Sequence, residues 1–239
     1  MSFSAGVFSI DSTGQPVVTG TTISSSVFNA FTADIATGLS TAVLKDGTQT
    51  ITANIPMSTF KLTGLAAGSA NGDSVRYEQL AMTISTEQAT TSGTSIDFTG
   101  IPSATRKITI MFVGVSTNGT SNLRIQIGDS GGFETTGYSG ACTYLINAGA
   151  IVGTTSGGGF LVTATTAASD TLHGKVVLDL ENASAFTWTS SGNLAAPNTQ
   201  MHVSGGSKSL SAELTQIRIT TVNGTDAFDA GVINISYRP

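Results

Sequence analysis

The sequence predicts a mainly β protein, with an N-terminal hairpin and a helix ahead of a C-terminal antiparallel β-sandwich of the jelly-roll type. Short apolar segments fill the C-terminal part, and turn residues separate them at regular intervals. The best helical periodicity lies near the N-terminus, and a short helix capped by Asp73 is predicted over residues 74–80. About nine or ten short strands with such turn spacing are typical of a sandwich or jelly roll.

The first forty-odd residues predict a hairpin and then one helix. Two apolar stretches, Phe3 to Ile10 and Pro16 to Val18, flank the turn-rich segment 11–14. The helix is predicted over 21–44, with Thr22 as a candidate N-cap.

One side of this helix is apolar, and the sequence predicts no partner helix to cover it. The apolar residues that recur at helical spacing are Ile23, Val27, Phe28, Phe31, Ile35 and Leu39. Helices this short are marginal alone in water, so the apolar side needs a partner. We expect an oligomer, although a dimer, a trimer and packing on the β domain would each bury it.

The C-terminal part shows the strand signals. Ile108 to Val115 reads as a strand, Asn118-Gly119 after it is a strong hairpin signal, and Leu123 to Ile127 alternates strictly. Further strands are predicted at Cys142 to Ile146, Phe160 to Thr165, Lys175 to Leu180, Phe186 to Thr189, Gln200 to Val203, Gln216 to Thr221 and Val232 to Tyr237.

Composition argues against several classes of function. Charged residues are 10% of the chain and the net charge is −5, so we expect no nucleic-acid partner, which would need clustered Lys and Arg. No apolar run approaches the roughly 18 residues of a membrane span, so we expect no membrane insertion. The N-terminus lacks the pattern of a signal peptide, and Cys142 is the only cysteine. A Ser/Thr-rich β protein without an export signal fits a virion component.

Several short motifs then occur in a characteristic order. They are residues 34–40 with 45–50, residues 54–67, and the run Gly72-Asp73-Ser74-Val75-Arg76-Tyr77-Glu78-Gln79-Leu80. Together they resemble the start of the shaft in phage tail-fibre proteins, over roughly residues 17–81. The pattern departs at Ser58-Thr59, where that family often has paired glycines. Residues 217–235 also resemble the C-termini of phage fibre proteins, over a shorter match.

The resemblance implies a homotrimer located in the phage tail of the virion. It implies an attachment segment at 1–20, an oligomerising helix at 21–44, an interleaved stalk and linker at 45–89, and the β-sandwich at 90–239. Expected partners are other tail or baseplate proteins and a host-surface glycan or protein. The alternative is a connector or short decoration fibre that binds other virion proteins and no receptor.

Candidate catalytic and metal-binding residues are few, and we predict no enzyme, no metal and no cofactor. His173 and His202 are isolated, and Cys142 lies in an apolar strand, so all three are interpreted as structural. The alternative for a histidine is a three-ligand metal site on a trimer axis.

Acidic residues offer two further alternatives. Asp226 and Asp229 lie in a loop that predicts a turn, with a calcium loop as the alternative. Asp179, Glu181 and Glu213 could form the carboxylate pair of a glycan hydrolase, but their positions indicate no pair.

Two aromatic residues are the candidates for receptor binding. Trp188 lies on the same strand face as Phe186, which favours a place in the core, with a stacking platform for a sugar as the alternative. Tyr138 lies in a glycine-rich loop, residues 131–138, and is expected to be exposed.

Overall fold

The computed structural model describes most of the chain, and it is mainly β with antiparallel sheets. The described residues are 3–4, 7–8, 20, 22, 24–40, 58–68, 70, 73–75, 80–146, 151–196 and 200–238. The chain divides into two compact units, Met1–Thr63 and Gly64–Pro239.

The first unit holds a short hairpin and a helix. Strand β1 (Phe3–Ser4) pairs with β2 (Val7–Phe8), so the pairing lies within the predicted first strand, and the predicted turn at 11–14 falls outside the described residues. Helix α1 spans Ser25–Ser40. Its N-cap is Ser24 rather than Thr22, because the carbonyl of Ser24 accepts the first helical hydrogen bond, from the Phe28 amide.

The second unit holds the remaining strands, which together are called the β domain below. They are β3 (Thr83–Ile84), β4 (Gln88–Ala89), β5 (Ser95–Thr99), β6 (Lys107–Thr117), β7 (Leu123–Asp129), β8 (Gly132–Phe133), β9 (Ser139–Ile146), β10 (Ile151–Ser156), β11 (Phe160–Leu161), β12 (Leu172–Asn182), β13 (Thr187–Ala196), β14 (Gln200–Ser209), β15 (Gln216–Thr221) and β16 (Phe228–Arg238).

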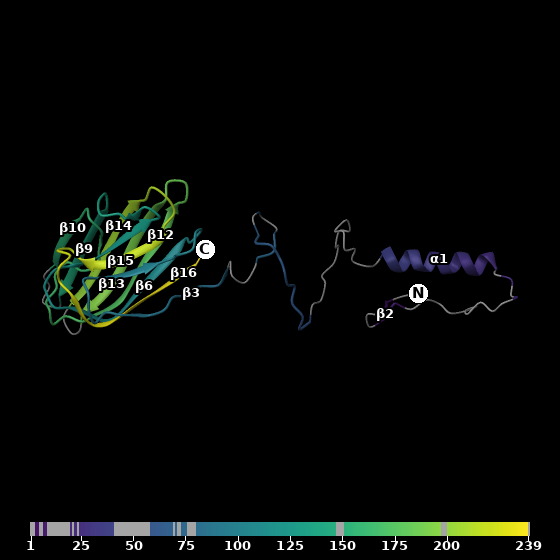
Figure 1. The fold of residues 1–239 in the computed structure, drawn as a ribbon, viewed down its shortest axis with the longest axis horizontal. Coiled ribbons are helices and arrows are strands. Elements are labelled where there is room, and N and C mark those ends of the chain that lie inside the picture. The colour runs from purple at the N-terminus through teal and green to yellow at the C-terminus, as the bar shows by residue number, and fades with distance from the viewer. Residues whose placement is uncertain are drawn as a thin grey trace. The chain divides into compact units, whose positions relative to one another are not determined.

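These strands form two antiparallel sheets (Figure 1). The larger sheet has the order β10-β9-β14-β13-β12-β6-β16-β3, with β4 also on β16. The smaller sheet has the order β11-β7-β15-β5, with β8 on β7. Because β3 and β4 pair with β16, the larger sheet includes residues of the predicted stalk and linker segment 45–89.

Both sheets contribute to one hydrophobic core. Strand β13 alternates strictly between buried and more exposed residues, which is the pattern of a strand with one face in the core. The largest side chains that are fully buried are Trp188, Phe112, Phe160 and Phe228. The predicted strand at Gln216–Thr221 has the same bounds as β15, and the other predicted strands coincide with or overlap β6, β7, β9, β11, β12, β13, β14 and β16.

The hairpin predicted at Asn118-Gly119 is wrong. Strand β6 lies in the larger sheet and β7 in the smaller one, so the turn connects the two sheets. A Cβ on Gly119 would meet the Asp226 carboxylate, which shows how closely a distant loop packs on this turn. Tertiary packing therefore overrides the local preference of the dipeptide.

The β domain has two ends that differ in the chain segments they carry. The near end is where the chain enters at β3 and where β16 finishes, because Thr83 pairs with Tyr237 and Lys107 pairs with Arg238. The far end is opposite, at Thr117 of β6 and Phe228 of β16. The near end carries the loops 100–106, 183–186 and 210–215, and the far end carries the loops 118–122, 162–171 and 222–227.

Candidate functional site

Two loops at the far end are tied together by hydrogen bonds. The amide of Asn118 donates to the carbonyl of Ala227, and the Ala227 amide donates back to Asn118 Oδ1, each at 2.9 Å. The Asp226 carboxylate accepts from Asn223 Nδ2 at 2.6 Å and from the Ser121 amide at 2.9 Å. These hydrogen bonds stabilise the charged carboxylate and lower the pKa of Asp226.

A third loop joins the same network. Thr163 Oγ1 accepts from the Leu123 amide at 2.9 Å, and Asn122 Nδ2 donates to the Ala164 carbonyl at 3.1 Å. Thr166 Oγ1 donates to the carbonyl of Ser121 at 3.3 Å. We call residues 118–122, 162–171 and 222–227 the far-end loop cluster. Its hydrogen bonds connect the three loops to one another and, through the Leu123 amide, to the start of β7.

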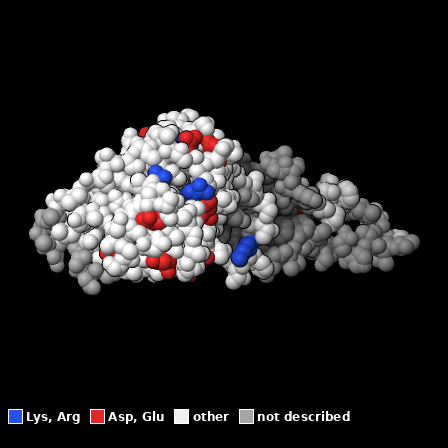
Figure 2. Space-filling model, turned by 60° about the vertical axis from the view of Figure 1, so that its left-hand side comes forward, with Lys and Arg blue, Asp and Glu red and all other residues white. Residues whose placement is uncertain are grey.

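The exposed surface of the far-end loop cluster is mostly polar and uncharged, although the apolar side chain of Val222 is also exposed. Its exposed residues with hydroxyl or amide side chains are Asn118, Thr120, Thr165, Ser169, Asn223 and Thr225. Figure 2 shows few charged residues on a face of the molecule that is largely uncharged. Fixed hydroxyl and amide groups of this kind can form hydrogen bonds with a neutral polar partner.

Tyr138 is not an exposed aromatic, so its predicted place in a receptor-binding surface is wrong. Its side chain is 5% exposed and its ring meets Phe160 edge-on. The hydroxyl accepts from the Ile127 amide at 2.8 Å and donates to the Glu134 carbonyl at 3.0 Å. Burial raises the pKa of this phenol. The glycine-rich loop therefore carries Tyr138 into the core.

Trp188 occupies the core position that its strand face predicts, with 2% of the residue exposed. It cannot offer an open ring face to a sugar, so the surface stacking platform is also wrong. One feature of its surroundings was not predicted. The indole Nε1–H is buried and has no hydrogen-bond partner in the structure.

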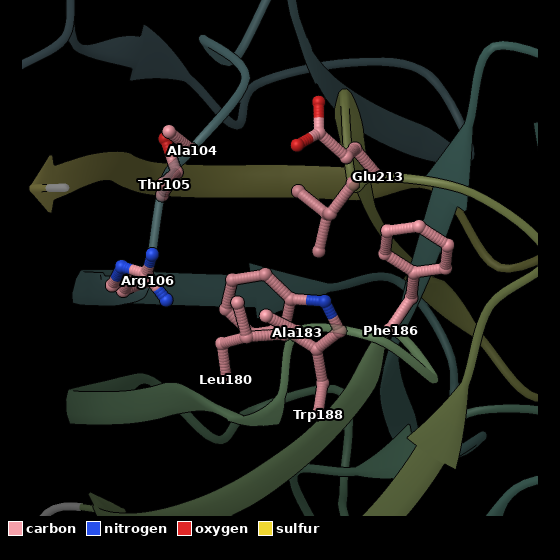
Figure 3. A pocket seen from close by; sticks show the side chains of 9 residues that line it. Ala104, Thr105, Arg106, Leu180, Ala183, Phe186, Trp188 and Glu213 are labelled. Atoms are coloured by element: carbon pink, nitrogen blue, oxygen red, sulfur yellow. The ribbon is translucent and has the colours of Figure 1, made fainter. Parts of the chain in front are cut away.

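A small pocket lies beside this indole at the near end (Figure 3). Its volume is about 90 Å³. The lining residues come from three loops and the ends of β12 and β13, and they are Ala104, Thr105, Arg106, Leu180, Ala183, Phe186, Trp188, Glu213 and Leu214. Sequence reasoning found Trp188, Phe186 and Glu213 separately, but no local signal joins segments so far apart in the chain.

Two lining residues have strained backbones. Ala104 has a φ of 67° and Phe186 a φ of 48°, in the left-handed region that side-chain-bearing residues rarely adopt. Such residues concentrate at functional sites, where the surrounding structure holds them in place.

The surroundings of Cys142, His202 and His173 differ in burial and in hydrogen bonding. Burial raises the pKa of the Cys142 thiol to about 12, so the thiol is protonated at neutral pH. His202 is fully buried, its Nδ1 accepts from the Ala164 amide at 3.3 Å, and burial lowers its pKa. His173 Nδ1 accepts from the Gly114 amide at the surface. Among the described residues, no group of three His, Cys, Asp or Glu side chains is placed to hold a metal ion.

The candidate carboxylates have separate surroundings. Asp179 forms an ion pair with Lys107 at 2.9 Å, whereas Glu213 lies at the pocket. At the far end, Asp229 accepts from Ser116 Oγ at 2.6 Å, and Asp226 is held by its own loop as predicted for a turn.

The apolar side of α1 is only partly covered. Val27 is 39% and Phe28 56% exposed, while Phe31 and Ile35 are half-buried. Ile23 and the side chain of Leu39 lie outside the described residues. In the part of the chain that the structure describes, no helix has both the length and the apolar character needed to cross a bilayer.

Comparison of the chain with known protein families, with characterised proteins and with solved structures finds no match.

Proposed function

We propose that this chain is a subunit of a trimeric phage tail fibre. In this proposal the helix at 21–44 and the stalk at 45–89 hold three copies together, and residues 1–20 attach the fibre to the tail. The domain at 90–239 is a jelly-roll β-sandwich whose far-end loop cluster contacts the host surface.

The observation that carries the host-binding part is the position of the two chain ends of the β domain. Residues before β3 and the end of β16 lie together at the near end. A stalk that joins there leaves the far-end loops free for an outside partner. Loops carried on a rigid sheet are the usual place for recognition. Three such surfaces on one fibre would bind by avidity, which raises the effective concentration of individually weak contacts.

The exposed apolar side of α1 supports oligomerisation, and the motifs over residues 17–81 support the count of three. A Phe28→Asp substitution places a charge on this apolar side and is expected to break the oligomer. The matched control is Ala33→Asp, which adds the same charge on the opposite side of the same helix. Light scattering should give three times the 24.2 kDa chain mass for the wild type and for the control, and a lower mass for Phe28→Asp. A monomeric wild type would overturn the proposal.

Host contact is tested on the same trimer. Thr225→Arg adds a bulky charge to the far-end loop cluster, and Ser184→Arg adds it to an exposed position at the near end. Binding of the labelled full chain to host cells should fall at least tenfold for Thr225→Arg only. Equal binding by both variants would exclude the far end as the contact surface.

The connector function is the second candidate, and exposed apolar side chains on the larger sheet favour it. Leu145 pairs with Ile151 on one side and with Met201 on the other, and each of the three is at least 42% exposed. An apolar surface of this kind suits another protein better than a glycan. Retention of the chain in virions without binding to host cells would favour the connector.

A further inference from the structure

The sole tryptophan has a hydrogen-bond donor without an acceptor. Trp188 Nε1–H is buried, and an indole nitrogen can only donate. Buried polar groups are nearly always paired in folded proteins, since an unpaired one loses its hydration without replacement. Figure 3 shows the nitrogen on the side of the indole that is nearest to Phe186 and Glu213, both of which line the pocket.

The size of the pocket limits the group that can satisfy this donor. Its volume of about 90 Å³ is smaller than the roughly 150 Å³ cavity that holds one benzene molecule. The pocket can therefore take a group of a few non-hydrogen atoms, and a whole sugar ring would remain outside.

The chemistry of the lining limits the group further. Leu180, Ala183 and Leu214 offer an apolar surface that suits a methyl group. The indole N–H needs a hydrogen-bond acceptor, for which a carbonyl oxygen is suited, and the carboxylate of Glu213, an exposed lining residue, can accept from an N–H. A methyl, a carbonyl and an N–H occur together in an acetamido group.

We propose that this pocket binds the acetamido group of an N-acetylated amino sugar. The methyl lies on the apolar lining, the carbonyl accepts from Trp188 Nε1–H, and the amide N–H donates to Glu213. Arg106 also lines the pocket, so its positive charge balances the negative charge of Glu213, and the lining as a whole suits a neutral group better than a free carboxylate. The strained backbones of Ala104 and Phe186 belong to two of the three loops that line the pocket. This site is at the near end and does not depend on the fibre function or on a trimer.

The test uses the single indole of the chain as its own probe. In the ¹⁵N-labelled full-length protein, Trp188 gives one indole N–H cross-peak. Titration with N-acetylglucosamine should shift this cross-peak and saturate at millimolar concentration, whereas glucose and glucosamine should leave it in place. No shift with N-acetylglucosamine, or an equal shift with glucose, would overturn the proposal. A shift with acetate alone would overturn it in favour of a carboxylate site.

Variants locate the binding to the pocket. Glu213→Ala should weaken N-acetylglucosamine binding at least tenfold, and Ala183→Leu should abolish it by filling the cavity. Glu181→Ala removes an exposed carboxylate outside the pocket and should bind as the wild type does. Wild-type affinity in both pocket variants would contradict the assignment. Light scattering on the same samples separates this result from the proposed function. A trimer whose indole cross-peak does not shift would overturn the proposed acetamido site and leave the proposed fibre function standing.

Discussion

The far-end loop cluster and the pocket at the near end differ in how far their polar groups are paired by hydrogen bonds. In the far-end loop cluster, the side chains of Asn118, Thr163 and Asp226 each accept a backbone N–H from another loop or strand. In the pocket, the Trp188 N–H is left without a partner and two backbones are strained. A surface that is internally satisfied is rigid and presents its outer groups to a partner. A site with an unpaired buried donor gains binding free energy when a ligand supplies the missing hydrogen-bond acceptor.

The largest expected effect comes from breaking the far-end network at its buried position. Thr163→Val keeps the side-chain shape but removes the acceptor of the Leu123 amide, which is buried. We expect a loss of about 1–3 kcal/mol in the free energy of unfolding. Chemical denaturation at one fixed protein concentration measures it, because oligomers gain stability with concentration. The exposed Thr165→Val should change stability by less than about 0.5 kcal/mol, and equal losses would contradict the assignment.

The second effect depends on pH and arises beneath the same cluster. His202 is buried, so its folded-state pKa lies below that of the unfolded chain. Between the unfolded value near 6.5 and the folded value, the unfolded state binds the extra proton. Stability should therefore fall as the pH decreases below about 6.5, by about 1.4 kcal/mol per pH unit for this group.

His202→Phe should flatten this pH dependence, while His173→Gln, at an exposed site, should keep it. The measurement is the denaturation midpoint between pH 7 and pH 5.5. An unchanged slope in His202→Phe would show that another group controls the acid response.

Substitutions that add or relieve backbone strain at the two ends should change the stability by smaller amounts. Gly224 has a φ of 70° and open space around it, so Gly224→Ala should cost about 1 kcal/mol through backbone strain alone. Ala104→Gly relieves strain at the pocket and should stabilise by roughly 0.5 kcal/mol, because the added freedom of the unfolded chain offsets part of the gain. Thermal or chemical denaturation measures both changes in stability. If both substitutions destabilised or both stabilised the protein, the predicted difference in backbone strain between the two ends would be wrong.

The sequence predicted the strands well because their signal is local. Alternation of apolar residues depends only on neighbours two apart, and it located Gln216–Thr221 with the bounds of β15. Sheet membership is not local. Asn118-Gly119 has the composition of a hairpin turn, yet β6 already pairs with β12 and β16, so the chain crosses to the other sheet.

The candidate site was harder to predict for a related reason. Tyr138 lies beside a glycine-rich segment, and only the folded chain shows that its hydroxyl reaches the backbone of Ile127. The pocket combines Ala104, Leu180, Phe186 and Glu213, which no spacing rule connects. A buried N–H without a partner can be recognised only once the neighbours of Trp188 are known.

Cryo-electron microscopy of the purified full-length chain tests the central claim most directly. We expect particles with three-fold symmetry, in which the N-terminal segments meet on the axis and the far-end loop clusters point away from it. Single β domains without an axis, or copies joined through their far-end loops, would contradict a trimeric fibre with free far-end loops.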